Sequence, residues 1–175
     1  MGKSQYKISF GGLPVGIHEF EFTINDKFFK GNDNSEVNKA NLQVRAVLTK
    51  QNNTMEVNFV IAGTVEVECD RCLKDFDFPI RNEERLLIKY GDPDESNDEL
   101  LVIKEGDTEF DASKYLYEFI VLAIPARKVP CEIDKRKFKC DEEALKKLES
   151  LTGIEDKTEI NPLWEQLNKL KKNKN

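Results

Sequence analysis

Residues 55–72 read MEVNFVIAGTVEVECDRC and decide the fold class of this chain. Apolar side chains occupy the odd positions from Met55 to Cys69, interrupted only by Gly63, while polar side chains hold most of the even positions. A period of two over this length is typical of an antiparallel strand with one buried face. The alternation resumes at Phe76–Ile80, so we predict a β-hairpin with the Cys-Asp-Arg-Cys sequence at its turn.

Shorter alternating runs lie on both sides of this hairpin, and the pattern changes in the last third of the chain. We expect further strands within residues 6–10, 18–24, 42–48 and 86–90. Apolar residues at helical spacing, preceded by acidic or Asn-Pro starts, predict helices within residues 111–125, 141–151 and 161–170. The predicted fold class is therefore α+β: an antiparallel β-sheet that can curl towards a barrel, with helices in the C-terminal third.

The chain has 175 residues and a formal net charge of −6. This length predicts a single domain over residues 1–175. Within it we expect an acidic, mobile connection at residues 91–110 and a basic C-terminal tail at residues 168–175. The net charge argues against a protein that coats nucleic acid by bulk electrostatics, although a local basic surface can still contact phosphate.

The start of the chain lacks the apolar core of a secretory signal, and no run of about 18 apolar residues is present. We therefore expect a cytoplasmic protein that does not enter a membrane. Four cysteines in a chain of this length also fit a reducing compartment. There, a Cys-x-x-Cys sequence is more often metal-binding or catalytic than a structural disulfide.

The four cysteines form two pairs that are far apart in the sequence. Cys69 and Cys72 lie in the hairpin turn, whereas Cys131 and Cys140 come much later. Two thiolates on a tight turn commonly supply half of a tetrahedral zinc site, so the four cysteines are candidate ligands for one zinc ion. Two alternatives remain open. Cys69 can be a small apolar core residue of its strand, or the first pair can serve a thiol oxidoreductase, although such pairs usually lie at a helix N-terminus.

A basic cluster surrounds the second cysteine pair, since residues 127–139 hold six lysines and arginines against two acidic residues. Arg71 in the hairpin turn is expected to point outward, where a guanidinium can pair with phosphate. Alternatively, Arg71 forms an ion pair with Glu68 or Asp70 of the same hairpin. The candidate contacts to RNA or to a partner are Arg71, Arg127, Lys128, Lys135, Arg136 and Lys137.

Residues that could form a catalytic site are sparse. His18 is the only histidine, and it falls on the apolar side of its expected strand. No Gly-x-x-x-x-Gly-Lys phosphate loop occurs. We therefore expect a protein that is not an enzyme.

At Val65–Phe76 the chain resembles the YceD family, bacterial and plastid proteins linked to accumulation of large-subunit ribosomal RNA. The resemblance continues through the acidic segment, the following helix, the Val-Pro-Cys sequence at 129–131 and the Asn-Pro helix at 161–167. It covers roughly residues 40–170, and the Cys-x-Arg-Cys and Asn-Pro elements are its specific parts. Many relatives have a tighter cysteine cluster in the later segment, and this departure bears on the four-cysteine zinc site.

The resemblance implies a non-enzymatic accessory factor for large-subunit ribosomal RNA accumulation, processing or ribosome assembly. Its partners would be a ribosomal RNA precursor or ribosome assembly intermediates. The alternative is a zinc-stabilised protein–protein adaptor without RNA contact, in which the helix that carries Trp164 binds the partner. A thiol oxidoreductase that uses the Cys-x-x-Cys pair is the third interpretation.

Overall fold

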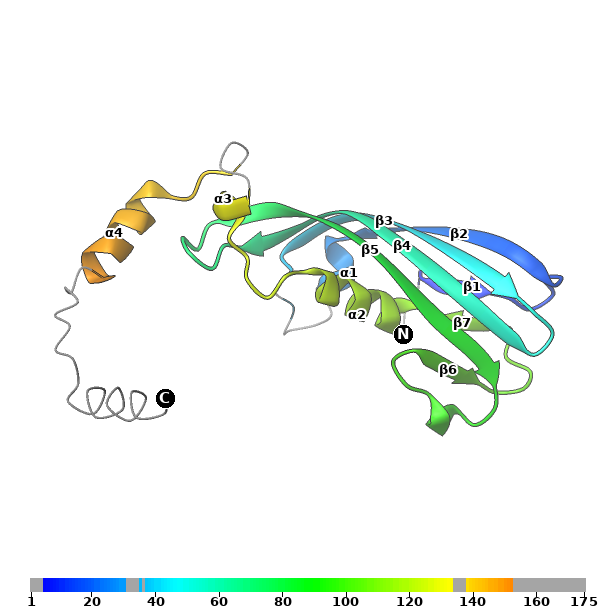
Figure 1. Ribbon diagram of the computed structural model, residues 1–175. Helices are drawn as coiled ribbons and strands as arrows, with labels where there is room; N and C mark the ends of the chain where they lie inside the picture. Colours follow the sequence, from blue (N-terminus) through cyan, green and yellow to red (C-terminus); the bar gives the residue numbers. More distant parts are fainter. Residues whose placement is uncertain (1–4, 31–34, 36, 134–137, 153–175) are drawn as a thin grey trace, which may run out of the picture. The chain divides into compact units, whose positions relative to one another are not determined.

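The computed structural model describes residues 5–30, 35, 37–133 and 138–152 (Figure 1). The chain divides into two compact units, residues 1–140 and residues 141–175. Both the basic tail and the helix around Trp164 that the sequence predicts lie outside the described residues.

The first unit contains two β-sheets and short helices. Its strands are β1 (Lys7–Ser9), β2 (Gly16–Asn25), β3 (Lys39–Lys50), β4 (Thr54–Glu68), β5 (Asp75–Tyr90), β6 (Leu100–Ile103) and β7 (Glu109–Asp111). Its helices are α1 (Asp26–Phe29), the 3-10 turn η1 (Pro93–Glu95), α2 (Ser113–Ala123) and α3 (Pro130–Ile133). In the second unit the structure describes helix α4 (Glu142–Thr152). None of the described helices is both long and apolar enough to cross a membrane.

The large sheet has the strand order β2-β3-β4-β5-β6, and β1 pairs with β7 in a second, two-stranded sheet. All pairings are antiparallel except β5 with β6. The long strands β3, β4 and β5 run side by side, with α2 against one face (Figure 1). The α+β prediction is thus confirmed; the sheet stays open and its described strands do not close into a barrel.

The β4–β5 hairpin follows the alternation of the sequence. Val57 lies opposite Leu86 and Val67 lies opposite Phe76, which places Cys69–Lys74 at the turn. The apolar odd residues of β4 are buried on one face because side chains of a strand alternate between its two faces. The hairpin is therefore long, with strands of 15 and 16 residues.

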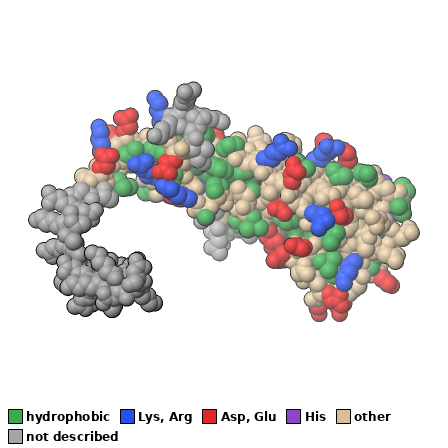
Figure 2. Space-filling view, viewed as in Figure 1, with side chains coloured by type: hydrophobic (Ala, Val, Ile, Leu, Met, Phe, Trp, Pro, Cys, Tyr) green, Lys and Arg blue, Asp and Glu red, His purple; other side chains and the backbone are tan. Residues whose placement is uncertain are grey.

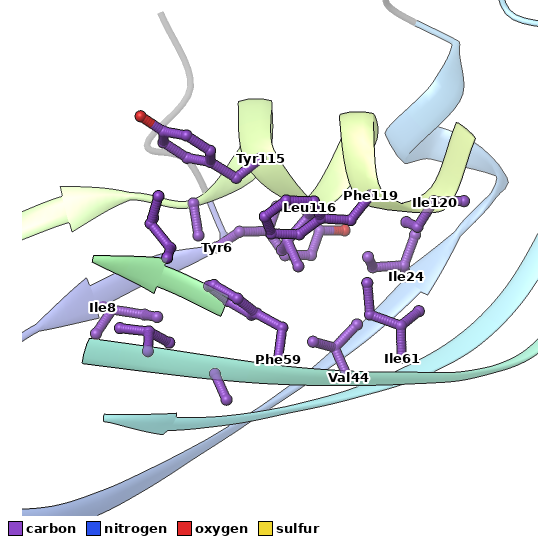
Figure 3. Packing of buried hydrophobic residues seen from close by; sticks show 14 of the residues in the cluster. Tyr6, Ile8, Ile24, Val44, Phe59, Ile61, Tyr115, Leu116, Phe119 and Ile120 are labelled. Carbon is purple, nitrogen blue, oxygen red and sulfur yellow. The ribbon is translucent and has the colours of Figure 1, made fainter. Parts of the chain in front are cut away.

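Helix α2 covers the inner face of the sheet. In Figure 3, Leu116 and Phe119 point from α2 towards Phe59 and Ile61 of β4. The ring centroids of Phe59 and Phe119 are 5.7 Å apart. Asn82, on the inner face of β5, donates an amide hydrogen bond to the carbonyl oxygen of Phe119 at 3.0 Å. This contact gives a half-buried polar group a partner and fixes the helix on the strand.

The acidic segment at residues 91–110 connects β5 to α2, and it also contains two elements that the alternation did not indicate. Strand β6 pairs in parallel with the end of β5, and β7 begins at Glu109. The four residues of β6 are all apolar, so a search for period two does not mark them as a strand. Whether the segment is mobile stays a prediction.

Gly63 interrupts the apolar face of β4 because the neighbouring strand comes too close for a side chain. Its φ is +147°, and a Cβ atom there would lie 2.2 Å from the carbonyl oxygen of Asn41 in β3. Only glycine fits such a position, since both the backbone conformation and the space exclude a side chain.

We predict that Gly63→Ala lowers the free energy of unfolding by at least about 2 kcal/mol more than Gly106→Ala does. Gly106 is a matched control: its φ is also positive, at +99°, but no atom lies within 4 Å of its ideal Cβ. Urea denaturation of both variants measures the difference. Equal losses of unfolding free energy in the two variants would contradict the close approach of β3 to β4 at Gly63.

Candidate metal centre and basic surface at the hairpin tip

The turn between β4 and β5 holds two buried cysteines. The N–H of Cys69 donates to the carbonyl oxygen of Lys74 at 3.0 Å, and the N–H of Leu73 donates to that of Cys69 at 2.9 Å. Leu73 takes a left-handed conformation, with φ of 59°, which closes the turn while its own side chain stays exposed. The side chains of Cys69 and Cys72 are 1% and 8% exposed. The turn therefore directs both thiols inward.

Asp70 joins this turn to the chain that follows α2. Its N–H donates to the carbonyl oxygen of Lys128 at 2.9 Å. In return, the N–H of Lys128 donates to the Asp70 carboxylate at 2.6 Å, and the Lys128 ammonium lies 3.6 Å from the other carboxylate oxygen. The Lys128 side chain is only 14% exposed, so this ion pair is largely shielded from solvent. We call these three contacts the Asp70 clamp; they join residues 58 positions apart in the sequence.

The Asp70 clamp places the second cysteine pair beside the first. Cys131, in α3, forms a disulfide with Cys140, which the sequence did not lead us to expect. The sulfur atoms of Cys69, Cys72 and Cys140 lie within 4.8 Å of one another. Because Cys131 is bonded to Cys140, the four sulfurs gather in one place. We call this group the cysteine cluster.

A cavity of about 180 Å³ opens beside the cysteine cluster. Phe76 and Phe138 meet edge to face in its wall, with ring centroids 5.9 Å apart. Lys74 and Lys139 also line it and place positive charge near the sulfurs. Several sulfur donors beside an apolar wall fit a borderline-soft cation such as zinc better than a hard one such as magnesium. The cluster can therefore hold a metal ion once the sulfurs are available as thiolates.

Two arginines from distant parts of the chain converge on one acidic residue near this cluster. Arg71 of the turn lies 4.0 Å from the Glu132 carboxylate, and Arg127 lies 3.0 Å from it. Their side chains are 45% and 73% exposed. The sequence left an ion pair with Glu68 or Asp70 as one alternative for Arg71; the structure pairs Arg71 with Glu132 of α3. Two positive charges share one negative charge, so the trio carries an excess positive charge at the surface.

Four other residues were predicted as contacts to RNA or to a partner. Lys128 belongs to the Asp70 clamp, and Lys135, Arg136 and Lys137 lie outside the described residues. Figure 2 shows lysines and arginines interleaved with acidic side chains over the visible face. The excess positive charge of Arg71 and Arg127 is therefore a local feature of the hairpin tip.

The residues at this tip lie within a segment that matches a known family. The model of the family described as "Large ribosomal RNA subunit accumulation protein YceD" matches residues 57–171, more than half of the chain. This chain belongs to the YceD family. The match includes the turn of the β4–β5 hairpin, α2, and all four cysteines of this YceD protein. The family description supports a ribosome-related accessory role. Comparisons with curated proteins and with solved structures gave no match.

The sequence indicated the four cysteines and Arg71, but not how they meet. The contact of Asp70 with Lys128 depends on a tertiary approach that no local spacing encodes. The Glu132 carboxylate could have been suspected as the acidic residue next to Cys131 in a basic stretch. The disulfide had no sequence signal beyond the spacing of Cys131 and Cys140.

We predict that Asp70→Ala lowers the free energy of unfolding by about 1–3 kcal/mol, because it removes the charge-assisted hydrogen bond and the ion pair that the Asp70 carboxylate forms with Lys128. Alkylation of Cys69 and Cys72 should also become faster as the turn loosens. Denaturant unfolding and mass-spectrometric thiol labelling measure the two effects.

Asp75→Ala is the control for this prediction, since the Asp75 carboxylate lies on the same hairpin and accepts an exposed 3.3 Å hydrogen bond from the side chain of Asn38. Its effect should stay within about 0.5 kcal/mol. If both variants behave alike in stability and in labelling, the Asp70 clamp does not hold the turn.

Proposed function

We propose that this YceD protein is a non-enzymatic, cytoplasmic accessory factor that contacts large-subunit ribosomal RNA, or a precursor of it, with its hairpin tip. The observation that carries the proposal is the convergence of Arg71 and Arg127 on Glu132 within a segment that matches the YceD family. The family description supports a ribosome-related role, and the arginine pair offers donors that can bind a phosphate backbone.

The two arginines are suited to phosphate because each guanidinium has five N–H donors in a planar fork. A single carboxylate uses few of these donors, and both side chains reach solvent. Glu132 holds the pair in position when RNA is not bound, so little side-chain order has to be gained on binding. Lys128 has a different part: it holds the turn through the Asp70 clamp. Lys135, Arg136 and Lys137 are included in the proposal on the basis of the sequence alone.

We also propose that the dithiol form of the cysteine cluster holds one zinc ion through Cys69, Cys72, Cys131 and Cys140. Zinc bound by four thiolates is a structural site with no open position for substrate. The ion would join the β4–β5 turn to the segment around α3, next to Arg71 and Arg127. Its part would be to stabilise the RNA-contacting surface.

The placement of the remaining reactive groups supports a role without catalysis. The imidazole of His18 hydrogen bonds to the carbonyl oxygen of Pro14 at 2.9 Å, and no histidine joins the metal-ligating group that the described residues form. The Cys-x-x-Cys pair lies on a turn between two strands rather than at a helix N-terminus, where thiol oxidoreductases activate a cysteine.

We predict that the double variant Arg71→Gln/Arg127→Gln reduces crosslinking of the protein to large-subunit ribosomal RNA by about tenfold, because two phosphate contacts are lost. Crosslinking in cells in which the variant replaces the native copy, followed by sequencing of the recovered RNA, measures the change. The amount of large-subunit ribosomal RNA should fall in the same cells.

The matched control is Arg81→Gln/Arg85→Gln. These arginines lie on β5, are more than half exposed and pair with Glu83 and Glu56, so the variant removes the same charge away from the tip. It should leave crosslinking unchanged. An equal loss in both variants would show a nonspecific charge effect. Absence of ribosomal RNA from the wild-type crosslinks would contradict the proposal and favour the adaptor without RNA contact.

A further inference from the structure

The sulfur of Cys140 takes part in two arrangements at once. It is bonded to Cys131, and it also lies within 4.8 Å of the sulfurs of Cys69 and Cys72. In a tetrahedral zinc–thiolate site the zinc–sulfur distance is about 2.3 Å, which puts the sulfurs about 3.8 Å apart. The observed cluster is thus close to the spacing of a metal site, although one of its sulfurs belongs to a disulfide.

The two arrangements exclude each other chemically. Zinc takes cysteine as thiolate, and a sulfur in a disulfide is not a thiolate. When Cys131 and Cys140 are joined, only Cys69 and Cys72 remain as thiols in the cluster. Two thiolates hold zinc far less well than four, so formation of the disulfide and retention of zinc compete.

Burial separates the two pairs into an inner and an outer one. Cys69 and Cys72 are buried, whereas Cys131 and Cys140 are half-buried. The inner pair is also fixed by the hydrogen bonds of the turn and by the Asp70 clamp. A small oxidant from solvent therefore reaches the outer pair first.

We propose that the cysteine cluster is a redox-controlled metal site: oxidation of Cys131 and Cys140 to their disulfide releases the zinc ion, and reduction restores the site. This inference rests on the proposed zinc site and names its regulation. The disulfide-bonded arrangement is then the oxidised state of the cluster, and the inner pair remains in place to receive the metal again.

The oxidant is a low-molecular-weight disulfide, RSSR. The thiolate of Cys131 attacks one sulfur of RSSR, which forms a mixed disulfide and releases the first RS⁻. The thiolate of Cys140 then attacks the Cys131 sulfur and releases the second RS⁻. Two electrons pass from the two cysteines to RSSR. The zinc ion leaves hydrated, and the thiolates of Cys69 and Cys72 each take up one proton.

The test uses the full chain, reduced and loaded with zinc in the absence of oxygen. Elemental analysis first gives the zinc content, expected to be one ion per chain. Oxidised glutathione is then added, zinc release is followed with a chromogenic chelator, and the disulfide is mapped by peptide mass spectrometry. We expect one zinc released for each Cys131–Cys140 disulfide formed, with Cys69 and Cys72 still open to alkylation after denaturation, and recovery of zinc binding after reduction.

Cys131→Ser is the test variant, because it keeps three thiols but cannot form the disulfide. Its bound zinc should leave at least tenfold more slowly when oxidised glutathione is added. If the variant does not retain zinc, the disulfide map of the wild-type protein still decides the question.

Three results would overturn the inference, and they separate it from the proposed zinc site. Failure of the reduced protein to bind zinc would refute both. Zinc that stays bound after the Cys131–Cys140 disulfide forms would refute the redox control alone. Zinc release that accompanies a disulfide between Cys69 and Cys72, and not one between Cys131 and Cys140, would also refute the redox control alone.

Discussion

The arrangement of the hairpin tip depends on one carboxylate, that of Asp70. A hairpin turn at the end of long strands is held by its own backbone hydrogen bonds and has few tertiary contacts of its own. Asp70 supplies such contacts by binding the backbone and the ammonium of Lys128. Since Lys128 leads into α3, this contact fixes where Cys131 and Glu132 lie relative to Cys69 and Arg71. Together with the ring contact of Phe76 and Phe138, it holds the segments that form the cysteine cluster and the arginine pair next to each other.

Sulfur and positive charge are next to each other at this tip for a physical reason. Four thiolates around one Zn²⁺ leave an excess of negative charge, which nearby cations stabilise. Lys74 and Lys139 line the cavity beside the sulfurs, and Arg71 and Arg127 lie close to α3. Loss of the metal with formation of a disulfide removes that negative charge. The redox state of the cluster would then change the electrostatic potential at the surface that contacts a phosphate backbone.

Much of the fold could be predicted because it follows from local patterns. The period-two alternation gave the β4–β5 hairpin, and helical spacing gave α2 and α4. Strand β6 has four consecutive apolar residues and a parallel partner, so alternation does not reveal it. The candidate site was predictable as a set of residues but not as an arrangement. The pairings of Asp70 with Lys128 and of Arg71 with Glu132 arise only when distant segments pack together, and sequence spacing carries no record of that packing.

We infer that the Asp70 clamp and the packing around it bring the two cysteine pairs into one site. X-ray absorption at the zinc edge of the reduced, zinc-loaded protein tests it most directly, because the spectrum reports the number and kind of the ligand atoms. We expect four sulfur ligands at about 2.3 Å, which only both pairs together can supply within one chain. A first shell with two sulfurs completed by nitrogen or oxygen would contradict it, since the pairs would then act separately.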